Sequence, residues 1–262
     1  MTTTASPAVS IRLDQRAEGT IAFVTVETPK LNIVGSAAIG AFIAAMADLH
    51  ARGDLRAVVL TGGGDKAFIG GADINEMASL TPESGRAFIT QLHEMCASLR
   101  DLPVPVIARI NGYALGAGLE VAAACDLRIA ASTAVFGMPE VRVGIPSVIE
   151  AALLPALIGW GRTRELLLTG EVIGADEALR WGLVERVVPP DELDAGVERW
   201  IAALLKAGPR AIRLQKALIR RWEDLPLGEA VKAGIACFAE AYTTDEPARL
   251  MRAFIARPRK RS

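Results

Sequence analysis

The 262-residue chain has few of the residues that build disulfide scaffolds, metal centres or nucleic-acid surfaces. Its three cysteines, Cys96, Cys125 and Cys237, are far apart, and its two histidines stand in no ligand motif. Lys+Arg number 29 and Asp+Glu 30, so the chain has no basic excess that would attract a nucleic acid. We therefore expect reduced thiols, no metal ion and no nucleic-acid partner.

Long apolar runs are also missing. The longest apolar stretches are broken by charges and by Pro155, and none approaches the ~20 residues that a helix needs to cross a bilayer. The opening segment MTTTASPAVS has neither a basic region nor an apolar centre, unlike a secretory signal. The sequence favours a cytoplasmic protein without a membrane partner.

Strand-like and helix-like segments alternate along the first 190 residues. Runs rich in β-branched residues predict strands at 20–26, 56–61, 104–110, 127–130 and 183–188. Apolar residues at the helical period follow Ser36 and Pro82. This alternation predicts an α/β domain with parallel strand pairing over residues 1–190.

Residues 191–262 have helical patterns only, which predicts a helical C-terminal region. A helix expected from about Gly228 bears an apolar stripe formed by Val231, Ile235, Phe238 and Tyr242. Such a stripe is typical of core packing and is also compatible with a contact between subunits. The basic run at 257–261 is interpreted as a solvated tail.

Two glycine-rich segments lead from strand-like runs into helix starts. They are FIGGADINEM at residues 68–77 and NGYALGAGLE at 111–120. Glycine permits close backbone approach, and unpaired N–H groups at a helix start can bind an anion or a polarised oxygen. A tight turn without a ligand accounts for the same residues. The G-x-G-x-x-G spacing of nicotinamide-dependent dehydrogenases and the G-x-S-x-G elbow of serine hydrolases are both missing.

Two glutamates stand in apolar surroundings. Glu120 opens an alanine-rich helix, and Glu140 follows a proline in a third segment, FGMPEVRVGIP, at 136–146. A carboxyl group in such surroundings tends to have a raised pKa, which suits acid/base chemistry near neutrality. For each glutamate alone, a helix-start carboxylate or a surface salt bridge is the simpler interpretation.

Together these motifs resemble the crotonase (enoyl-CoA hydratase/isomerase) superfamily. The resemblance runs from PKLN at 29–32, through the three segments and CDLRIAA, to LTGEVIGADEALRWGLVERVVP at 168–189. It implies a spiral of repeated ββα units with a helical C-terminal trimerisation region, assembled as a homotrimer or a dimer of trimers. It also implies an acyl-CoA substrate, with coenzyme A as part of the substrate and no separate cofactor.

The resemblance further implies roles for individual residues. The backbone N–H groups of Ala72 and Ala117 would form an oxyanion hole for the thioester carbonyl. The residues that would lie beside the acyl-CoA are Lys30, Asp73, Ile74, Asn75 and Gly118. Phe254 would join them, because the C-terminal tail that begins there would cover the coenzyme A of its own or a neighbouring subunit.

Family members that hydrate enoyl thioesters carry two glutamates, and Glu120 and Glu140 match both motif positions. The resemblance thus implies an enoyl-CoA hydratase, a lyase that adds water across the C2–C3 double bond with the glutamates as acid and base. An enoyl-CoA isomerase or a specialised hydroxyacyl-CoA dehydratase is the alternative on this scaffold. A non-catalytic acyl-CoA- or RNA-binding member is an alternative of another class.

One stretch departs from the family pattern. Ser147, Val148, Ile149 and Glu150 stand where hydratases usually have a glycine-rich run, which by resemblance lines the acyl pocket. Their larger side chains are expected to reshape that space. Glu150 is expected either to face solvent or to face the pocket. In the second case it would favour a polar or branched acyl group.

Overall fold

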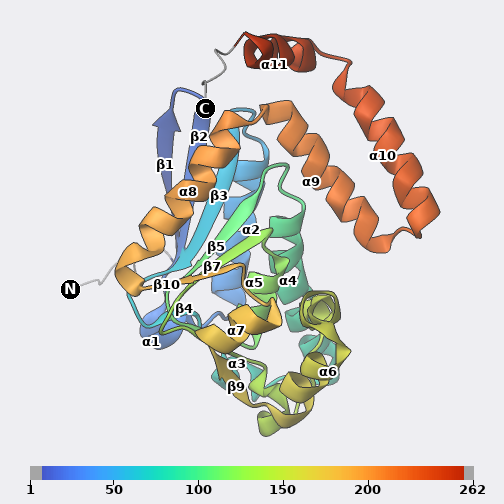
Figure 1. Ribbon diagram of the computed structural model, residues 1–262. Helices are drawn as coiled ribbons and strands as arrows, with labels where there is room; N and C mark the ends of the chain where they lie inside the picture. Colours follow the sequence, from blue (N-terminus) through green and yellow to red (C-terminus); the bar gives the residue numbers. More distant parts are fainter. Residues whose placement is uncertain (1–7, 257–262) are drawn as a thin grey trace.

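The computed structural model describes residues 8–256, and its centre is a six-stranded sheet (Figure 1). The strand order is β1 (Val9–Arg16), β2 (Gly19–Val26), β3 (Leu55–Gly62), β5 (Val106–Ile110), β7 (Leu127–Ala131) and β10 (Arg186–Val188). β1 and β2 pair antiparallel, and all other pairs are parallel. The α/β class and the parallel pairing expected from the sequence are confirmed. The antiparallel edge strand β1 was not predicted from the sequence.

A second sheet of short strands lies beside the first. It contains β4 (Ala67–Ile69), β6 (Tyr113–Leu115), β8 (Val135–Gly137) and β9 (Val172–Gly174), in that order. Each of the long strands β3, β5 and β7 is followed by one of these short strands and then by helical structure. The chain therefore repeats a ββα unit three times, which is the spiral that the resemblance implies.

Helices cover both faces of the larger sheet. On one face, α2 (Ser36–His50), α4 (Pro82–Arg100) and α5 (Ala117–Ala124) contribute to the main hydrophobic core, with Phe42, Met95 and Val121 fully buried. On the other face, α8 (Leu193–Lys206) buries Val197 and Ile201 against the sheet. The other elements before residue 193 are α1 (Pro29–Asn32), α3 (Ile74–Met77), η1 (Pro139–Val143), η2 (Ile149–Leu153), α6 (Leu154–Thr169), α7 (Ala175–Trp181) and η3 (Pro190–Glu192).

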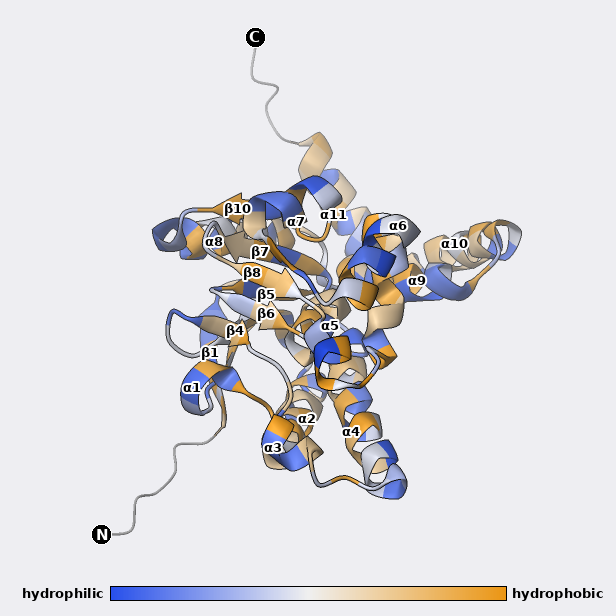
Figure 2. Ribbon diagram, turned by 90° about the horizontal axis from the view of Figure 1, so that it is seen from below, coloured by the Kyte–Doolittle hydropathy of each residue, from blue (hydrophilic) through white to orange (hydrophobic). Residues whose placement is uncertain are grey.

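The last three helices form an arm that extends away from the sheets (Figure 1; Figure 2). They are α9 (Pro209–Asp224), α10 (Leu227–Ala241) and α11 (Glu246–Ile255). The predicted apolar stripe on α10 is exposed, with Ile235 at 68% and Phe238 at 67% exposure. Core packing within this chain is therefore the wrong interpretation of the stripe. The predicted basic tail at 257–261 lies outside the described residues.

Candidate active site

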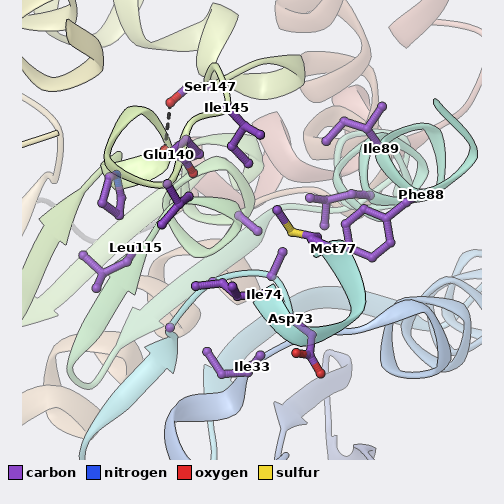
Figure 3. A pocket seen from close by; sticks show the side chains of 18 of the residues that line it. Ile33, Asp73, Ile74, Met77, Phe88, Ile89, Leu115, Glu140, Ile145 and Ser147 are labelled. Atoms are coloured by element: carbon purple, nitrogen blue, oxygen red, sulfur yellow. Dashed lines mark hydrogen bonds between the residues drawn. The ribbon is translucent and has the colours of Figure 1, made fainter. Parts of the chain in front are cut away.

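A cavity of about 940 Å³ opens where the two glycine-rich turns meet α4 and the residues after β8. Its lining includes both predicted glutamates, both predicted backbone donors and an apolar wall. Figure 3 shows Glu140 in this cavity together with the apolar side chains of Met77, Phe88 and Ile145. The residues of the lining that were predicted from sequence are Lys30, Ala72, Asp73, Ile74, Asn75, Ala117, Glu120 and Glu140. The fold thus gathers segments that are up to 110 residues apart in the chain, from Lys30 to Glu140.

The first turn connects β4 to α3 through Gly70 and Gly71. A side chain at position 70 would meet the Leu31 carbonyl oxygen at 2.8 Å, so glycine allows α1 to pack on this turn. Asp73 then caps α3, because its Oδ1 accepts a hydrogen bond from Asn75 N–H at 2.9 Å. Among the hydrogen bonds of residues 8–256, none uses the N–H of Ala72, which lines the cavity.

The second turn connects β6 to α5 and brings the start of that helix against β4. A side chain at Gly118 would lie 1.9 Å from the Ile69 carbonyl oxygen, so only glycine permits this approach. Ala117 is the first residue of α5, and the first N–H groups of a helix have no intrahelical partner. Gly118 therefore supports the site through packing and, unlike Ala117, does not line the cavity.

Glu120 projects from the first turn of α5 and is only 4% exposed. Its Oε1 accepts a hydrogen bond from Ala151 N–H at 3.2 Å. Burial raises the pKa of the Glu120 carboxyl to about 8; the Ala151 hydrogen bond lowers it, and the negative charges of Glu140 and Glu150 raise it. This carboxyl group therefore retains its proton at neutral pH.

Glu140 belongs to η1 and lines the same cavity. Its Oε2 accepts a hydrogen bond from Ser147 Oγ at 2.8 Å (Figure 3). Its Oε1 lies over Gly116, where an added side chain would meet this oxygen at 2.3 Å. The carboxyl group is thus held between a hydroxyl donor and a glycine that has φ +52°. The two glutamates share one cavity, and each has a donor from residues 147–151.

The cavity also has an apolar wall, of which only Val148 was assigned to the site from the sequence. It consists of Met77, Leu80, Phe88, Ile89 and Leu92, which belong to α3, α4 and the turn between them, and of Val143, Ile145 and Val148, which follow β8. The spacing of Phe88 and Leu92 does predict a common helix face. Their role in a cavity could be found only from the position of α4 over α5, which no local pattern encodes.

The departing stretch at 147–150 takes up positions that differ from residue to residue. Ser147 and Val148 line the cavity. Ile149 has φ +38°, which is rare for a β-branched residue. Glu150 is 6% exposed, outside the cavity lining, and its Oε1 lies 2.9 Å from His93 Nδ1. Both expectations for Glu150, solvent and pocket, are therefore wrong.

Phe254 is the predicted site residue that lies apart from the others. It is in α11, at 71% exposure, and does not line the cavity of its own chain. In Figure 1, α11 and the cavity element α3 lie at opposite ends of the molecule. Within residues 8–256, no helix is long and apolar enough to cross a membrane.

Comparison with known proteins identifies the family of this chain. Residues 16–260 match the family described as enoyl-CoA hydratase/isomerase. A short-chain-enoyl-CoA hydratase of Clostridium acetobutylicum is 38% identical over 91% of this chain and 92% of its own. A crotonyl-CoA hydratase of Syntrophomonas wolfei is 40% identical over 76% of each chain. The crystal structure of an enoyl-CoA hydratase from Bacillus anthracis superposes with a TM-score of 0.87 at 32% identity, covering 93% of this chain and 95% of that one.

The fold and the site thus define a protein of the crotonase class. The chain belongs to the enoyl-CoA hydratase/isomerase family.

Proposed function

We propose that this protein is an enoyl-CoA hydratase that adds water across the C2–C3 double bond of an enoyl-CoA thioester. The observation that carries the proposal is the convergence of two carboxyl groups, Glu120 and Glu140, on one cavity beside the N–H groups of Ala72 and Ala117. The hydratase names of the relatives support the same reaction.

The two N–H groups supply the electrostatic part of the mechanism. Negative charge develops on the thioester oxygen when water attacks C3. Donors at Ala72 and Ala117 that are fixed before the reaction stabilise this charge without reorganisation, and each is worth about 3 kcal/mol in comparable sites. Ala117 opens α5, so the partial positive charge of the helix N-terminus acts in the same direction.

The two glutamates supply the proton transfers. As the water oxygen bonds to C3, one carboxylate accepts a proton from the water, and a protonated carboxyl group delivers a proton to C2. The pair must therefore hold one proton at neutral pH. The raised pKa of Glu120 provides that proton, because burial and neighbouring negative charge disfavour its ionised form.

We assign the coenzyme A moiety to the cavity rim, where Lys30, Asp73, Ile74 and Asn75 lie. Lys30 is the cation of this group and suits a phosphate. Its neighbour Asn32 is buried and donates to the Ala67 carbonyl oxygen at 2.8 Å, which ties this segment to β4. The reaction needs no metal or redox cofactor, since coenzyme A arrives with the substrate.

The apolar wall favours an apolar acyl group. Phe88, Ile89 and Leu92 of α4 line the cavity together with Ile145 and Val148, and all five side chains are apolar. Glu150, on which the expectation of a polar acyl group rested, lies outside the lining. Val148 narrows the space that a glycine would leave open, so a short acyl chain is proposed.

A panel of enoyl-CoA thioesters of varied length and branching tests this function. Loss of the conjugated-enoyl absorbance should accompany a mass gain of one water, and short straight chains should have the highest kcat/KM. An isomerase would shift the double bond without a mass change. A dehydratase would prefer the reverse reaction on a particular hydroxyacyl-CoA. Binding of acyl-CoA without any turnover would indicate a non-catalytic member.

We also propose assembly as a trimer or a dimer of trimers. The exposed side chains of Leu227, Ile235, Phe238 and Phe254 on α10 and α11 form an apolar surface that a monomer would leave in water. Burial of these side chains against neighbouring subunits stabilises the arm. Phe254 would then be close to the cavity of a neighbour or to the subunit contact itself.

A further inference from the structure

A buried carboxyl group, Glu150, pairs with an exposed histidine, His93, beside the segment that contacts the proposed catalytic glutamates. Glu150 lies in the first turn of η2, and its Oε1 lies 2.9 Å from Nδ1 of His93 on α4. The Glu150 side chain is 7% exposed and that of His93 is 54% exposed, so the histidine connects the buried carboxyl group to solvent. Among the described residues, Glu150 Oε2 has no hydrogen-bond partner.

We propose that the His93–Glu150 pair is a positioning device that holds residues 147–151 against both catalytic glutamates and places a third carboxylate behind Glu120. The effect of the His93–Glu150 pair on catalysis rests on the proposed function. Its structural and electrostatic parts can be measured without turnover.

The positioning part follows from the hydrogen bonds of this segment. Ser147 Oγ donates to Glu140 Oε2 at 2.8 Å, and Ala151 N–H donates to Glu120 Oε1 at 3.2 Å. One short segment therefore supplies a donor to each glutamate. Glu150 is the residue next to Ala151, so a bond that fixes the Glu150 side chain to α4 also fixes the second donor.

The backbone of the segment indicates that such a restraint is needed. Ile149, at φ +38°, adopts a left-handed conformation that β-branched residues avoid. Residues in such conformations persist where the surrounding structure holds them. The His93–Glu150 contact lies one residue further along the chain and bonds this segment to the neighbouring α4.

The electrostatic part follows from the charged groups around Glu120. Glu140 faces it from η1, Glu150 from η2, and the Cys96 thiol from α4. Around Glu150 itself stand His93 and Cys96 of α4 and Glu120 of α5. A negative charge on Glu150 disfavours a second negative charge on Glu120, so it helps Glu120 to retain its proton.

Glu150→Gln tests the electrostatic part, since it keeps an acceptor for His93 and removes the charge. Carboxyl ¹³C NMR of glutamate-labelled protein, with the Glu120 signal assigned by its loss in Glu120→Gln, follows the titration without any substrate. We expect the midpoint of Glu120 to fall, by less than in Glu140→Gln, because Glu150 is the smaller of the two charges that raise it. An unchanged midpoint would overturn the electrostatic role.

His93→Ala and His93→Asn test the positioning part and do not require Glu150 to be replaced. Asparagine retains a donor near the Nδ1 position, whereas alanine removes it. We expect faster amide hydrogen exchange at Ala151 and at least a tenfold loss of kcat at little-changed KM in His93→Ala, with both effects largely reversed in His93→Asn. His50→Asn, at the exposed end of α2, is the matched control.

Equal exchange at Ala151 in all three histidine variants would overturn the positioning role. If wild-type protein hydrates no enoyl-CoA, the proposed function fails, but the NMR and exchange results still decide the structural inference. If Glu150→Gln does not fold, the His93 pair of variants still decides the positioning part.

Discussion

A methyl group added at Gly116 should lower the stability of the protein only slightly but should lower kcat strongly. It has φ +52° and ψ −120°, a conformation that L-residues other than glycine rarely adopt. A methyl group on it would lie 2.3 Å from Glu140 Oε1, about 1 Å closer than an ordinary contact allows. Gly116→Ala therefore strains the turn before α5 and also displaces the Glu140 carboxyl group.

The two consequences have different magnitudes. Backbone strain of this kind costs about 1–3 kcal/mol, which a protein well above that stability survives. A displacement of about 1 Å in a catalytic group costs on the order of 10²-fold in rate. We therefore expect Gly116→Ala to fold, to lose a few degrees in Tm, and to lose kcat by about 100-fold.

Gly159→Ala is the matched control for strain. Gly159 in α6 also has a positive φ, +77°, but an added side chain there would meet no atom within 4 Å. Both variants should lose similar stability in thermal unfolding, and steady-state kinetics on the best enoyl-CoA should show a large loss of kcat for Gly116→Ala alone. Near-native turnover in folded Gly116→Ala would refute the placement of Glu140 at the reacting atoms.

Three further predictions follow from the site and the arm. Ala117→Gly keeps the backbone donor and should have near-native turnover. Ala117→Pro removes the N–H, so its kcat should fall about 10²–10³-fold while its circular dichroism spectrum stays native. A folded proline variant with normal turnover would exclude this donor. Because the folded-state pKa of Glu120 is raised from 4.5 to about 8, the stability that its proton contributes is fully present below pH 4.5 and is lost as pH rises through 8. Relative to Glu120→Gln, wild-type protein should therefore lose a few kcal/mol of unfolding free energy between pH 5 and pH 9 in urea titrations, and parallel pH profiles would contradict the burial of this carboxyl group. Light scattering at micromolar concentration should give the mass of a trimer or hexamer, and Phe238→Asp with Ile235→Asp should shift it toward the monomer; a monomeric wild-type protein would contradict the assembly.

The longer strands were predictable because their buried β-branched residues form continuous runs. Val58, Val59 and Leu60 of β3, for example, are all fully buried between helices on both faces of the sheet. The strands β4, β6, β8 and β9 have three residues each, too few for any periodicity to be visible. β1 was not predicted, although Val9, Ile11 and Leu13 alternate with polar residues in the pattern that favours a half-buried strand.

The candidate site was predictable where glycine and glutamate stand in recognisable motifs. Glu120 and Glu140 could be named from the motifs, and the structure brings both to one cavity. The partners of residues 147–151 could not be named, because His93 lies 57 residues from Glu150 in the chain and sits in an ordinary helical pattern. Contacts of this kind depend on how α4 packs against η2.

The most direct test of the account is the kinetics of four proteins on the best enoyl-CoA: wild type, Glu120→Gln, Glu140→Gln and the double variant. We predict that each single variant loses roughly 10²–10⁴-fold in kcat, as expected for removal of a general acid or base. The double variant should be far less than multiplicatively worse, because the two groups act on one water molecule. Near-native hydration by either folded single variant would contradict the two-glutamate mechanism.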